Sequence, residues 1–330
     1  RDAIESIALG QTHIVVGTHA LFQRDVEFAK LGLTIVDEQH RFGVHQRLSL
    51  REKGVLNNRV PHQLTMTATP IPRTLAMTAY ADLDCSVIDE LPPGRQQIQT
   101  VAVPTSRRME VIERVGAAIA EGRQVYWVCT LVEESEVLQA RAAEDTVTEL
   151  GGYLPQASVS MVHGRMSGTD KDEIMQRFKA NQVQLLVATT VIEVGVDVPN
   201  ASLIIIENAE RLGLSQLHQL RGRVGRGSVA SSCVLVYESG LSQRATERIA
   251  IMRETNDGFA IAEKDLELRG AGELLGTRQT GVTHFRIADL MRDKHLLERA
   301  RELADKVPPK QVSALVDRWM GGDAPVYGNV

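Results

Sequence analysis

Residues 33–40 set the class of fold, and they read Leu33-Thr34-Ile35-Val36-Asp37-Glu38-Gln39-His40. The apolar half is short, rich in β-branched residues and free of alternating polar residues, which predicts a strand buried in a parallel sheet. In open α/β sheets, ligands bind just beyond the carboxyl ends of the strands. We therefore expect Asp37 and Glu38 to stand at the rim of a site.

Two adjacent carboxylates at a strand end suit a magnesium-bound nucleotide. One carboxylate can hold the metal, and the other can align or deprotonate the attacking water. The simpler interpretation is an acidic strand end that only caps the next helix. That interpretation is common for one carboxylate and less so for two acids followed by the amide of Gln39 and the imidazole of His40.

The composition is that of a soluble globular protein. Hydrophobic residues make up 43% of the 330 residues and charged residues 24%, and this length favours two domains with room for a small third unit. No apolar run approaches the roughly 20 residues that span a bilayer, so we expect no membrane partner. The sequence begins at Arg1 and not at methionine, which suggests a fragment.

The cysteines indicate the redox environment of the protein, and the net charge limits how it can bind nucleic acid. Cys85, Cys129 and Cys233 are isolated and show no metal-ligand spacing, which favours a reducing, cytosolic environment. The net charge of −5 argues against bulk electrostatic coating of nucleic acid. It leaves room for local basic grooves, because phosphate binding depends on where the charge lies.

Strand-like and helix-like segments alternate along most of the chain. Strands are expected at residues 14–16, 33–36, 62–66, 99–103, 124–129, 158–162, 184–188, 203–206 and 233–237, and helices at 73–80, 106–121, 134–150 and from Ser167 or Thr169 to Phe178. Gly151 and Gly152 are expected to end the third helix. This alternation predicts parallel βαβ units in doubly wound α/β sheets, followed by a largely helical tail from Leu241 onward.

A breaker-rich segment, Leu91-Pro92-Pro93-Gly94-Arg95-Gln96-Gln97, is the best linker candidate. It divides the chain into a first part over residues 1–91, a linker over 92–98, a second lobe over 99–240 and a helical region over 241–330.

A basic, glycine-rich stretch is the second chemical signal, and it reads Gln216-Leu217-His218-Gln219-Leu220-Arg221-Gly222-Arg223-Val224-Gly225-Arg226-Gly227. Between Arg211 and Ser228 there are four arginines and no acid. The forked guanidinium donors match phosphate oxygens, and such an arginine can stabilise charge on a γ-phosphoryl group during transfer. Alone, the stretch could equally be a solvated basic loop or a non-catalytic nucleic-acid patch.

Small hydroxyl residues follow several of the expected strands. Thr189 and Thr190 begin a helical turn that leads to Gly195 and Asp197, and hydroxyls and amides at a helix start can hold a backbone phosphate. Thr18 and the pair Thr67 and Thr69 are weaker examples, and His163 is weak alone. Each of these residues could instead simply belong to an ordinary turn.

Taken in order, these motifs resemble a superfamily 2 helicase or translocase with two RecA-like lobes. The strings 37–44 (DEQHRFGV), 67–75 (TATPIPRTL) and 89–95 (DELPPGR) are similar to the RecG family of bacterial ATP-dependent branch-migration helicases. The string 269–281 (RGAGELLGTRQTG) is similar to a translocation element that this family shares with transcription-repair coupling factor. The resemblance covers nearly the whole chain and implies an incomplete first lobe, a complete second lobe and a helical carboxyl-terminal tail.

The resemblance also implies residue roles. Asp37 would hold Mg²⁺ and Glu38 would activate water, while Arg223 and Arg226 would reach ATP as the catalytic arginines. The remaining residues would bind the nucleotide (Gln39, His40, Gln219, Gly195, Asp197), couple it to the lobe interface (Thr67, Thr69) or contact DNA (Thr18, His163, Arg165, Thr189, Arg278, Gln279).

The implied cofactors are ATP and Mg²⁺, and the implied partners are branched DNA (forks and Holliday junctions) and single-stranded DNA-binding protein. The family resemblance further implies a monomer in the bacterial cytoplasm, associated with the nucleoid, that remodels stalled forks and Holliday junctions in recombination and repair.

A phosphate-binding loop with the pattern G-x-x-x-x-G-K-[ST] is missing, since the sequence holds no Gly-Lys dipeptide. We therefore expect this chain alone to be inactive as an ATPase. Three alternatives remain open: a coupling-factor-like translocase, a non-catalytic DNA-binding module, and, at a distance, a metalloenzyme using Asp37, Glu38, His40 and His45.

Overall fold

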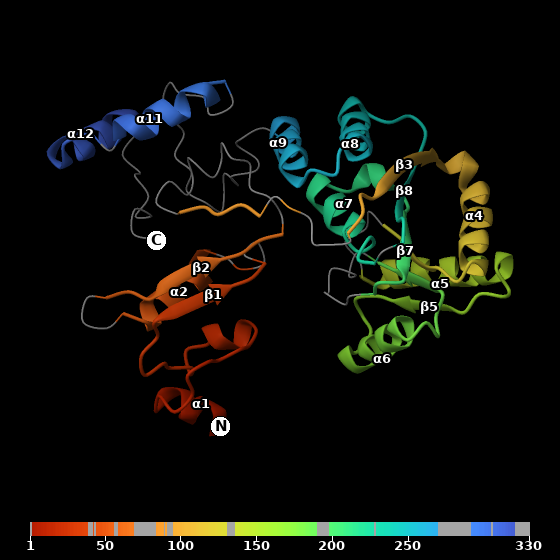
Figure 1. Ribbon diagram of the computed structural model, residues 1–330, viewed down its shortest axis with the longest axis horizontal. Helices are drawn as coiled ribbons and strands as arrows, with labels where there is room; N and C mark the ends of the chain where they lie inside the picture. Colours follow the sequence, from red (N-terminus) through yellow and green to blue (C-terminus); the bar gives the residue numbers. More distant parts are fainter. Residues whose placement is uncertain are drawn as a thin grey trace. The chain divides into compact units, whose positions relative to one another are not determined.

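A computed structural model describes residues 2–38, 42, 44–55, 59–68, 84–88, 90, 95–130, 136–189, 198–227, 229–269, 292–304 and 306–320. The chain divides into two compact units (Figure 1). The first unit comprises residues 1–70 and 271–330, and the second comprises residues 71–270.

The second unit is built on a parallel sheet. Within the described residues it has six strands, β3 (Gln99–Pro104), β4 (Gln124–Val128), β5 (Val159–Val162), β6 (Leu185–Ala188), β7 (Ala201–Ile206) and β8 (Ser232–Tyr237). Their order across the sheet is β3-β8-β7-β4-β6-β5, and every neighbouring pair is parallel. All six carboxyl ends therefore lie at one edge, where ligands bind in such sheets.

Helices cover both faces of this sheet. α4 (Arg108–Ala120) and α5 (Glu136–Tyr153) pack on one face, in a core cluster that includes Val115, Trp127 and Ile205. α6 (Gly168–Lys179), α7 (Leu214–Arg221) and α8 (Gln243–Glu254) pack on the other face, in a cluster that includes Tyr126 and Ile204. The expected doubly wound α/β sheet is thus confirmed for this unit.

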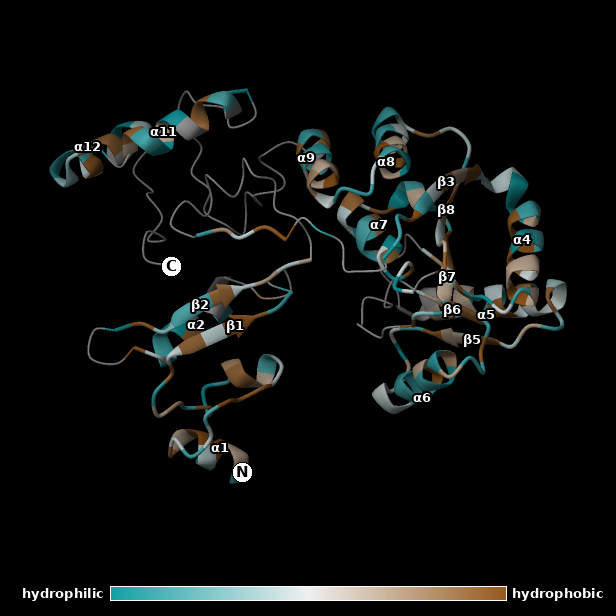
Figure 2. Ribbon diagram, in the orientation of Figure 1, coloured by the Kyte–Doolittle hydropathy of each residue, from teal (hydrophilic) through white to brown (hydrophobic). Residues whose placement is uncertain are grey.

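The central strands β4, β6 and β7 are buried along their whole length. The hydropathy colours of Figure 2 show the apolar character of β7. A strand that is covered on both faces must be apolar at successive positions, because both faces contribute to cores. One exception is Gln124 at the start of β4, whose buried amide donates to the carbonyl oxygens of Phe178 and Val183, both at 2.6 Å. These bonds compensate the cost of burying the amide group.

The helices α8 and α9 (Gly258–Arg269) extend this unit beyond the sheet. The Ser242 hydroxyl accepts from the Ala245 amide and caps α8. Arg248 of α8 donates to the carbonyl oxygens of Leu212 (3.0 Å) and Glu210 (2.6 Å), so this helix is bonded to the segment that leads into α7.

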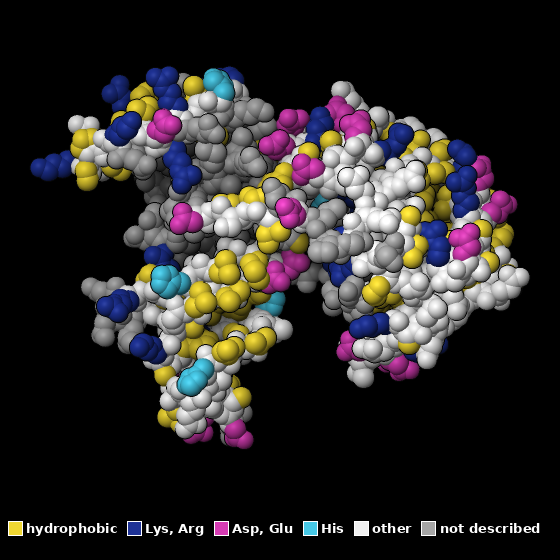
Figure 3. Space-filling view, in the orientation of Figure 1, with side chains coloured by type: hydrophobic (Ala, Val, Ile, Leu, Met, Phe, Trp, Pro, Cys, Tyr) yellow, Lys and Arg dark blue, Asp and Glu magenta, His cyan; other side chains and the backbone are white. Residues whose placement is uncertain are grey.

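The first unit contains α1 (Asp2–Ala8), the 3-10 turn η1 (His19–Phe22), β1 (Leu33–Val36), α2 (Val44–Lys53) and β2 (His62–Thr65), and also η6 (Lys294–Leu296), α11 (Leu297–Ala304) and α12 (Pro309–Met320). In it, β1 and β2 pair in parallel, with Ile35 beside Leu64. These two side chains are 59% and 48% exposed, and hydrophobic side chains gather on the face of this unit seen in Figure 3. The strand expected at residues 33–36 is thus present, but the expectation that it is buried is wrong for one of its faces, where Leu33 is also 54% exposed. Parallel sheets are ordinarily covered on both faces, and the described residues leave this face of β1 and β2 uncovered.

Some expected elements differ from the structure. Residues 14–16 form no strand, and Ile14 and Val16 are largely exposed, because a short apolar run needs a paired neighbour to become a strand. The helix expected to stop at Gly151 continues to Tyr153. Leu150 is fully buried and Leu154 packs on the same core, and this packing outweighs the helix penalty of about 1 kcal/mol for each glycine.

Two other expected elements lie wholly or partly outside the described residues. The helix expected at residues 73–80 and residues 91–94 at the start of the expected linker lie outside the described residues. In the part of the chain that is described, no helix combines the length and apolar character needed to cross a membrane.

Candidate nucleotide and nucleic-acid site

The acid pair stands at the carboxyl end of β1, as the sequence predicts. Asp37 is exposed and Glu38 is half-buried. The Glu38 amide donates to Asp37 Oδ1 at 2.8 Å, and Glu38 adopts a left-handed backbone with a φ of 52°. This conformation costs a non-glycine residue on the order of 1 kcal/mol or more and is concentrated at functional sites. The turn therefore sets two adjacent carboxylates beyond the strand instead of continuing it.

Thr67 lies close to the acid pair at the same edge. β1 and β2 end together, with Val36 beside Thr65, and the Met66 amide donates to the Val36 carbonyl oxygen at 2.8 Å. Thr67 follows directly and is half-buried. The predicted partners Gln39, His40 and Thr69 lie outside the described residues.

Thr18 precedes the turn η1 and is exposed. Its side chain makes no capping hydrogen bond, although it occupies the N-cap position. A surface hydroxyl in such a turn is suited to contact a backbone phosphate.

The basic stretch is split by the structure into a buried and an accessible part. Arg226 is exposed and its Nε donates to the Gly222 carbonyl oxygen at 3.4 Å, while Gln219 and Arg223 are half-buried. Arg221, by contrast, is only 2% exposed. The three arginines of the stretch therefore do not form one continuous basic surface.

Arg221 bonds to the end of helix α8. Its Nη1 donates to the carbonyl oxygens of Met252 (3.0 Å) and Thr255 (2.8 Å), and its Nη2 lies 3.1 Å from His218 Nδ1. Carbonyl groups at the end of a helix have no partner within the helix, so this buried guanidinium satisfies them. The sequence did not reveal this structural role, because the local sequence does not distinguish a buried arginine from an exposed one.

His218 is held neutral beside these cations. Burial, followed by the charges of Arg221 and Arg95, lowers the pKa of His218 to about 4, against a smaller opposing effect of Asp257. Arg95 thus belongs to the surroundings of the basic stretch, although it comes from the segment before β3. Sequence reasoning quoted Arg95 within a motif and assigned it no role at the site.

Two glycines allow the basic stretch to approach its neighbours closely. Gly225 has a φ of 78° and packs on Ile98, and a Cβ at Gly227 would lie 2.5 Å from the Pro199 carbonyl oxygen. Any side chain at Gly227 would therefore displace backbone. These two glycines therefore serve close packing of the stretch against its neighbours.

His163 and Thr189 follow the neighbouring strands β5 and β6. Val162 pairs with Ala188, and the Thr189 amide donates to the Val162 carbonyl oxygen at 3.2 Å. Thr189 is 2% exposed, and its hydroxyl has no hydrogen-bond partner among the described residues. Arg165 is exposed in the turn that follows His163. Three of the predicted DNA-contacting residues therefore come together at one sheet edge.

The other predicted residues, Gly195, Asp197, Arg278 and Gln279, lie outside the described residues. Asp37 and Glu38 belong to the first unit and Gln219, Arg223 and Arg226 to the second, so the structure describes the two halves of the predicted nucleotide site separately.

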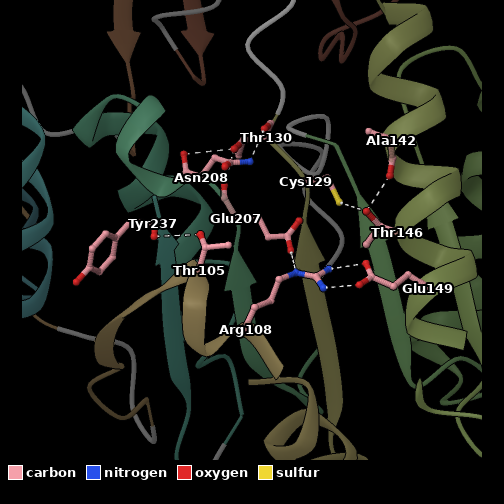
Figure 4. A network of polar contacts seen from close by, with 10 residues as sticks. All are labelled: Thr105, Arg108, Cys129, Thr130, Ala142, Thr146, Glu149, Glu207, Asn208 and Tyr237. Atoms are coloured by element: carbon pink, nitrogen blue, oxygen red, sulfur yellow. Dashed lines mark hydrogen bonds and ion pairs between the residues drawn. The ribbon is translucent and has the colours of Figure 1, made fainter. Parts of the chain in front are cut away.

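A polar network at the carboxyl ends of β3, β4 and β7 was not predicted (Figure 4). Arg108 Nε donates to Glu207 Oε1 at 2.5 Å, and its Nη1 and Nη2 donate to the two carboxylate oxygens of Glu149 at 2.8 and 3.0 Å. The guanidinium carbon lies 5.2 Å from the centre of the Trp127 ring. Burial disfavours the charged form of Arg108 and acts to lower its pKa. The hydrogen bonds and charges of Glu149 and Glu207 outweigh this effect, so the pKa of Arg108 is raised.

Next to this cluster, β4 and β7 are bonded at their ends. The Thr130 hydroxyl donates to the Glu207 carbonyl oxygen at 2.5 Å, and Asn208 Nδ2 donates to the Thr130 carbonyl oxygen at 3.2 Å (Figure 4). Asn208 has a φ of 47°, in the left-handed region that asparagine tolerates. The network fixes the point at which the chain leaves β7 for α7 and the basic stretch.

Two family models match this chain, the helicase conserved C-terminal domain over residues 108–228 and the ATP-dependent DNA helicase RecG, domain 3, C-terminal, over residues 255–315. The ATP-dependent DNA helicase RecG of Escherichia coli strain K12 is 62% identical over 320 residues, which are 96% of this chain and 46% of that protein. The chain belongs to the RecG family. It corresponds to a carboxyl-terminal part of a RecG protein and spans about half the length of the curated relatives it matches.

Other comparisons agree with this RecG assignment. The RecG of Haemophilus influenzae is 58% identical over 99% of this chain and 48% of that protein. A structure of RecG bound to a three-way DNA junction is 43% identical, covers 90% of this chain and 37% of that one, and has a TM-score of 0.66. The Mycobacterium smegmatis helicase Lhr, with 19% identity over 72% of this chain and 33% of that one and a TM-score of 0.53, shares the fold alone. The sheet of the second unit is thus RecA-like.

Proposed function

We propose that this chain is the carboxyl-terminal part of an ATP-driven double-stranded DNA translocase that remodels stalled replication forks and Holliday junctions in recombination and repair. The observation that carries the proposal is 62% identity to a protein named ATP-dependent DNA helicase RecG over 96% of the chain. The solved RecG structure bound to a three-way DNA junction supports branched DNA as the partner.

The first unit supplies the acids of the nucleotide site in this proposal. Asp37 and Glu38 offer hard carboxylate oxygens beyond a parallel strand, and such a donor set fits Mg²⁺. Asp37 would hold the ion, which neutralises charge on the phosphates when bound. Glu38, kept beside it by the turn at its left-handed backbone, orients and deprotonates the attacking water. In the same proposal, Gln39, His40, Thr67 and Thr69 couple the bound nucleotide to the second lobe.

The second unit supplies the cations. Arg223 and Arg226 stabilise the charge that develops on the transferred phosphoryl group, and Gln219, Gly195 and Asp197 complete the nucleotide contacts. The fixed glycines Gly225 and Gly227 support the choice of Arg226, because they hold its backbone in one place while its side chain remains exposed. Preorganised donors of this kind cost little reorganisation during the reaction.

DNA contacts come from both units. Thr18, His163, Arg165 and Thr189 bind the phosphate backbone, and Arg278 and Gln279 belong to the translocation element. The common sheet edge of His163, Arg165 and Thr189 supports this role. Thr189 must become more accessible on binding, because its hydroxyl is buried in this structure.

The wider arrangement follows from the same proposal. Residues 1–91 form part of the first RecA-like lobe, 92–98 the linker, 99–240 the second lobe and 241–330 the helical translocation hairpin and tail. The exposed apolar face of β1 and β2 supports an incomplete first lobe. We further propose a monomer that acts at the nucleoid in the bacterial cytoplasm, with single-stranded DNA-binding protein as a partner.

The chain alone should hydrolyse ATP negligibly, because it has no Gly-Lys dipeptide and hence no phosphate-binding loop. By itself it acts as a non-catalytic DNA-binding module.

The test is phosphate release with and without forked DNA, on this chain and on a chain extended upstream to the length of the relatives. We expect forked DNA to stimulate hydrolysis only in the longer chain, and Glu38→Gln to abolish it there. DNA-stimulated hydrolysis by the short chain at a rate typical of helicases would contradict the proposal, as would an inactive longer chain.

A further inference from the structure

Three aromatic rings from two separate segments pack together in the first unit. His19 and Phe22 lie in η1, directly after Thr18, and Phe42 lies four residues after Glu38. The Phe42 ring centre is 4.7 Å from that of His19 and 5.1 Å from that of Phe22, and both ring pairs are tilted. Tilted pairs at this separation are favourable aromatic geometries. The sequence holds only six phenylalanines, and two of them are in this cluster.

A lysine makes a second connection between the same two segments. Lys53, the last residue of α2, donates from Nζ to the carbonyl oxygens of Leu21 (3.4 Å), Gln23 and Val26 (2.8 Å). Burial lowers the pKa of Lys53, while the charges of Asp25 and Glu27 oppose this shift. Leu21 belongs to η1, while Gln23 and Val26 follow it in a segment without helix or strand, where no ladder of backbone bonds satisfies the carbonyl groups. Lys53 therefore fixes the backbone that follows η1.

These two connections link the places where the proposed ligands bind. Residues 18–26 carry Thr18, and residues 37–53 carry the acid pair at one end and Lys53 at the other. Phe42 follows Glu38 by four residues, so a tether of at most about 14 Å of extended chain joins the carboxylates to the ring. Because the rings and the lysine hold the segments at two separate points, a shift of either segment displaces the other.

We propose that Phe42 and Lys53 are positioning residues that couple the nucleotide-facing carboxylates to the DNA-facing turn at Thr18. The inference rests on the proposed function, which assigns ATP to Asp37 and Glu38 and DNA to Thr18. Neither Phe42 nor Lys53 touches the reacting atoms. Their effect is to make the position of Thr18 depend on that of the acid pair, within one lobe and without the arginines of the second unit.

The test uses a chain of the relatives' full length with Phe42→Leu or Lys53→Met. ATP hydrolysis is measured without DNA and with saturating duplex DNA, together with the DNA concentration that gives half-maximal stimulation. We expect hydrolysis without DNA to stay close to the wild-type rate in both variants. The stimulation by saturating DNA should fall by about fivefold or more, the range of coupling between linked sites.

Two further variants separate coupling from stability. Phe178→Leu, in the core of the second unit, removes a fully buried ring and should lower the thermal midpoint without changing the ratio of rates with and without DNA. Lys53→Arg keeps a cation that can donate to the three carbonyl oxygens and should retain most of the stimulation.

The outcomes are distinct. Wild-type stimulation in both Phe42→Leu and Lys53→Met would overturn the inference, and so would an equal loss of hydrolysis with and without DNA, which marks a purely structural role. If one variant fails to fold, the other decides by the same ratio. An unmodified longer chain that DNA does not stimulate would instead overturn the proposed function, and the inference with it.

Discussion

Arg221 and Arg226 carry the same charge in the same stretch, and their surroundings give them different roles. Arg221 is enclosed between α7 and the end of α8, where its donors meet backbone carbonyl groups. Arg226 is exposed beyond Gly225 and bonds weakly to Gly222. Only the second is placed to meet a phosphate from solution.

Replacing each arginine by methionine should lower the free energy of unfolding to very different extents. Arg221→Met leaves two carbonyl groups at the end of α8 without donors, so we expect it to lower the free energy of unfolding by about 2–4 kcal/mol. Arg226→Met changes an exposed side chain and should alter stability by less than about 0.5 kcal/mol. Urea unfolding of this chain measures both values, and equal losses would contradict the assignment.

His218 should make stability depend on pH. Its pKa is lowered to about 4 by burial and by the charges of Arg221 and Arg95, whereas histidine in an unfolded chain titrates near 6.5. Between these values the unfolded chain binds the proton and the folded chain does not, so protonation favours unfolding. The contribution is complete above about pH 6.5 and is lost by up to about 1.4 kcal/mol per pH unit as the pH falls towards 4.

Urea unfolding at pH 7 and pH 4.5 checks this expectation with His218→Gln as the comparison. The variant should lose less stability than the unmodified chain over this interval. Parallel losses in the two proteins would show that His218 does not titrate as its surroundings indicate.

At the scale of elements, the carboxyl edge of the second sheet is held by side chains and not by strand pairing alone. Arg108 at the start of α4 bonds Glu207 beyond β7 and Glu149 in α5, which joins three elements far apart in the sequence (Figure 4). Its neighbour Arg107 makes an exposed pair with Glu110 in the same helix. The two adjacent arginines therefore form a matched comparison.

Arg108→Leu should destabilise the second unit by about 2–4 kcal/mol, because two carboxylates, one of them largely buried, lose their partner. Arg107→Leu should cost no more than about 0.5 kcal/mol, since exposed pairs contribute little. Thermal and urea unfolding provide the measurement. If the two substitutions had the same small effect, the network would be peripheral to stability.

At the scale of the whole molecule, the residues proposed to bind one nucleotide are divided between two units, and the phosphate-binding loop is missing from the sequence. DNA binding does not depend on that loop, since the proposed contacts of Thr18, His163 and Arg165 go to the phosphate backbone. Contacts of this kind carry no sequence information and little junction information.

This chain should bind DNA weakly, with an affinity that falls steeply with salt and without preference for a fork over a duplex. Gel-shift titrations of both DNAs at several salt concentrations measure this. Strong selectivity for the fork would show that the chain itself recognises the junction and would contradict the expectation.

The sequence by itself determined the α/β class, the run of strands in the second unit and the place of the acid pair. These features are local, because burial on both faces requires continuous apolar runs in strands such as β6 and β7. Asp37 and Glu38 directly follow the short apolar run that forms β1. The start of α6 was predictable only as Ser167 or Thr169, and the structure selects Ser167, whose hydroxyl accepts from the Asp170 amide within one turn.

Only the tertiary structure decided which of the charged residues are buried and what they bond. Arg221 meets the end of α8 some thirty residues later in the chain, and Arg108 meets Glu207 from across the sheet, at separations that no local pattern encodes. The same holds for α5, which continues through Gly151 and Gly152 because Leu150 is buried. Side-chain burial depends on partners that folding brings together, so residues of the same type have different environments and different roles in the folded protein.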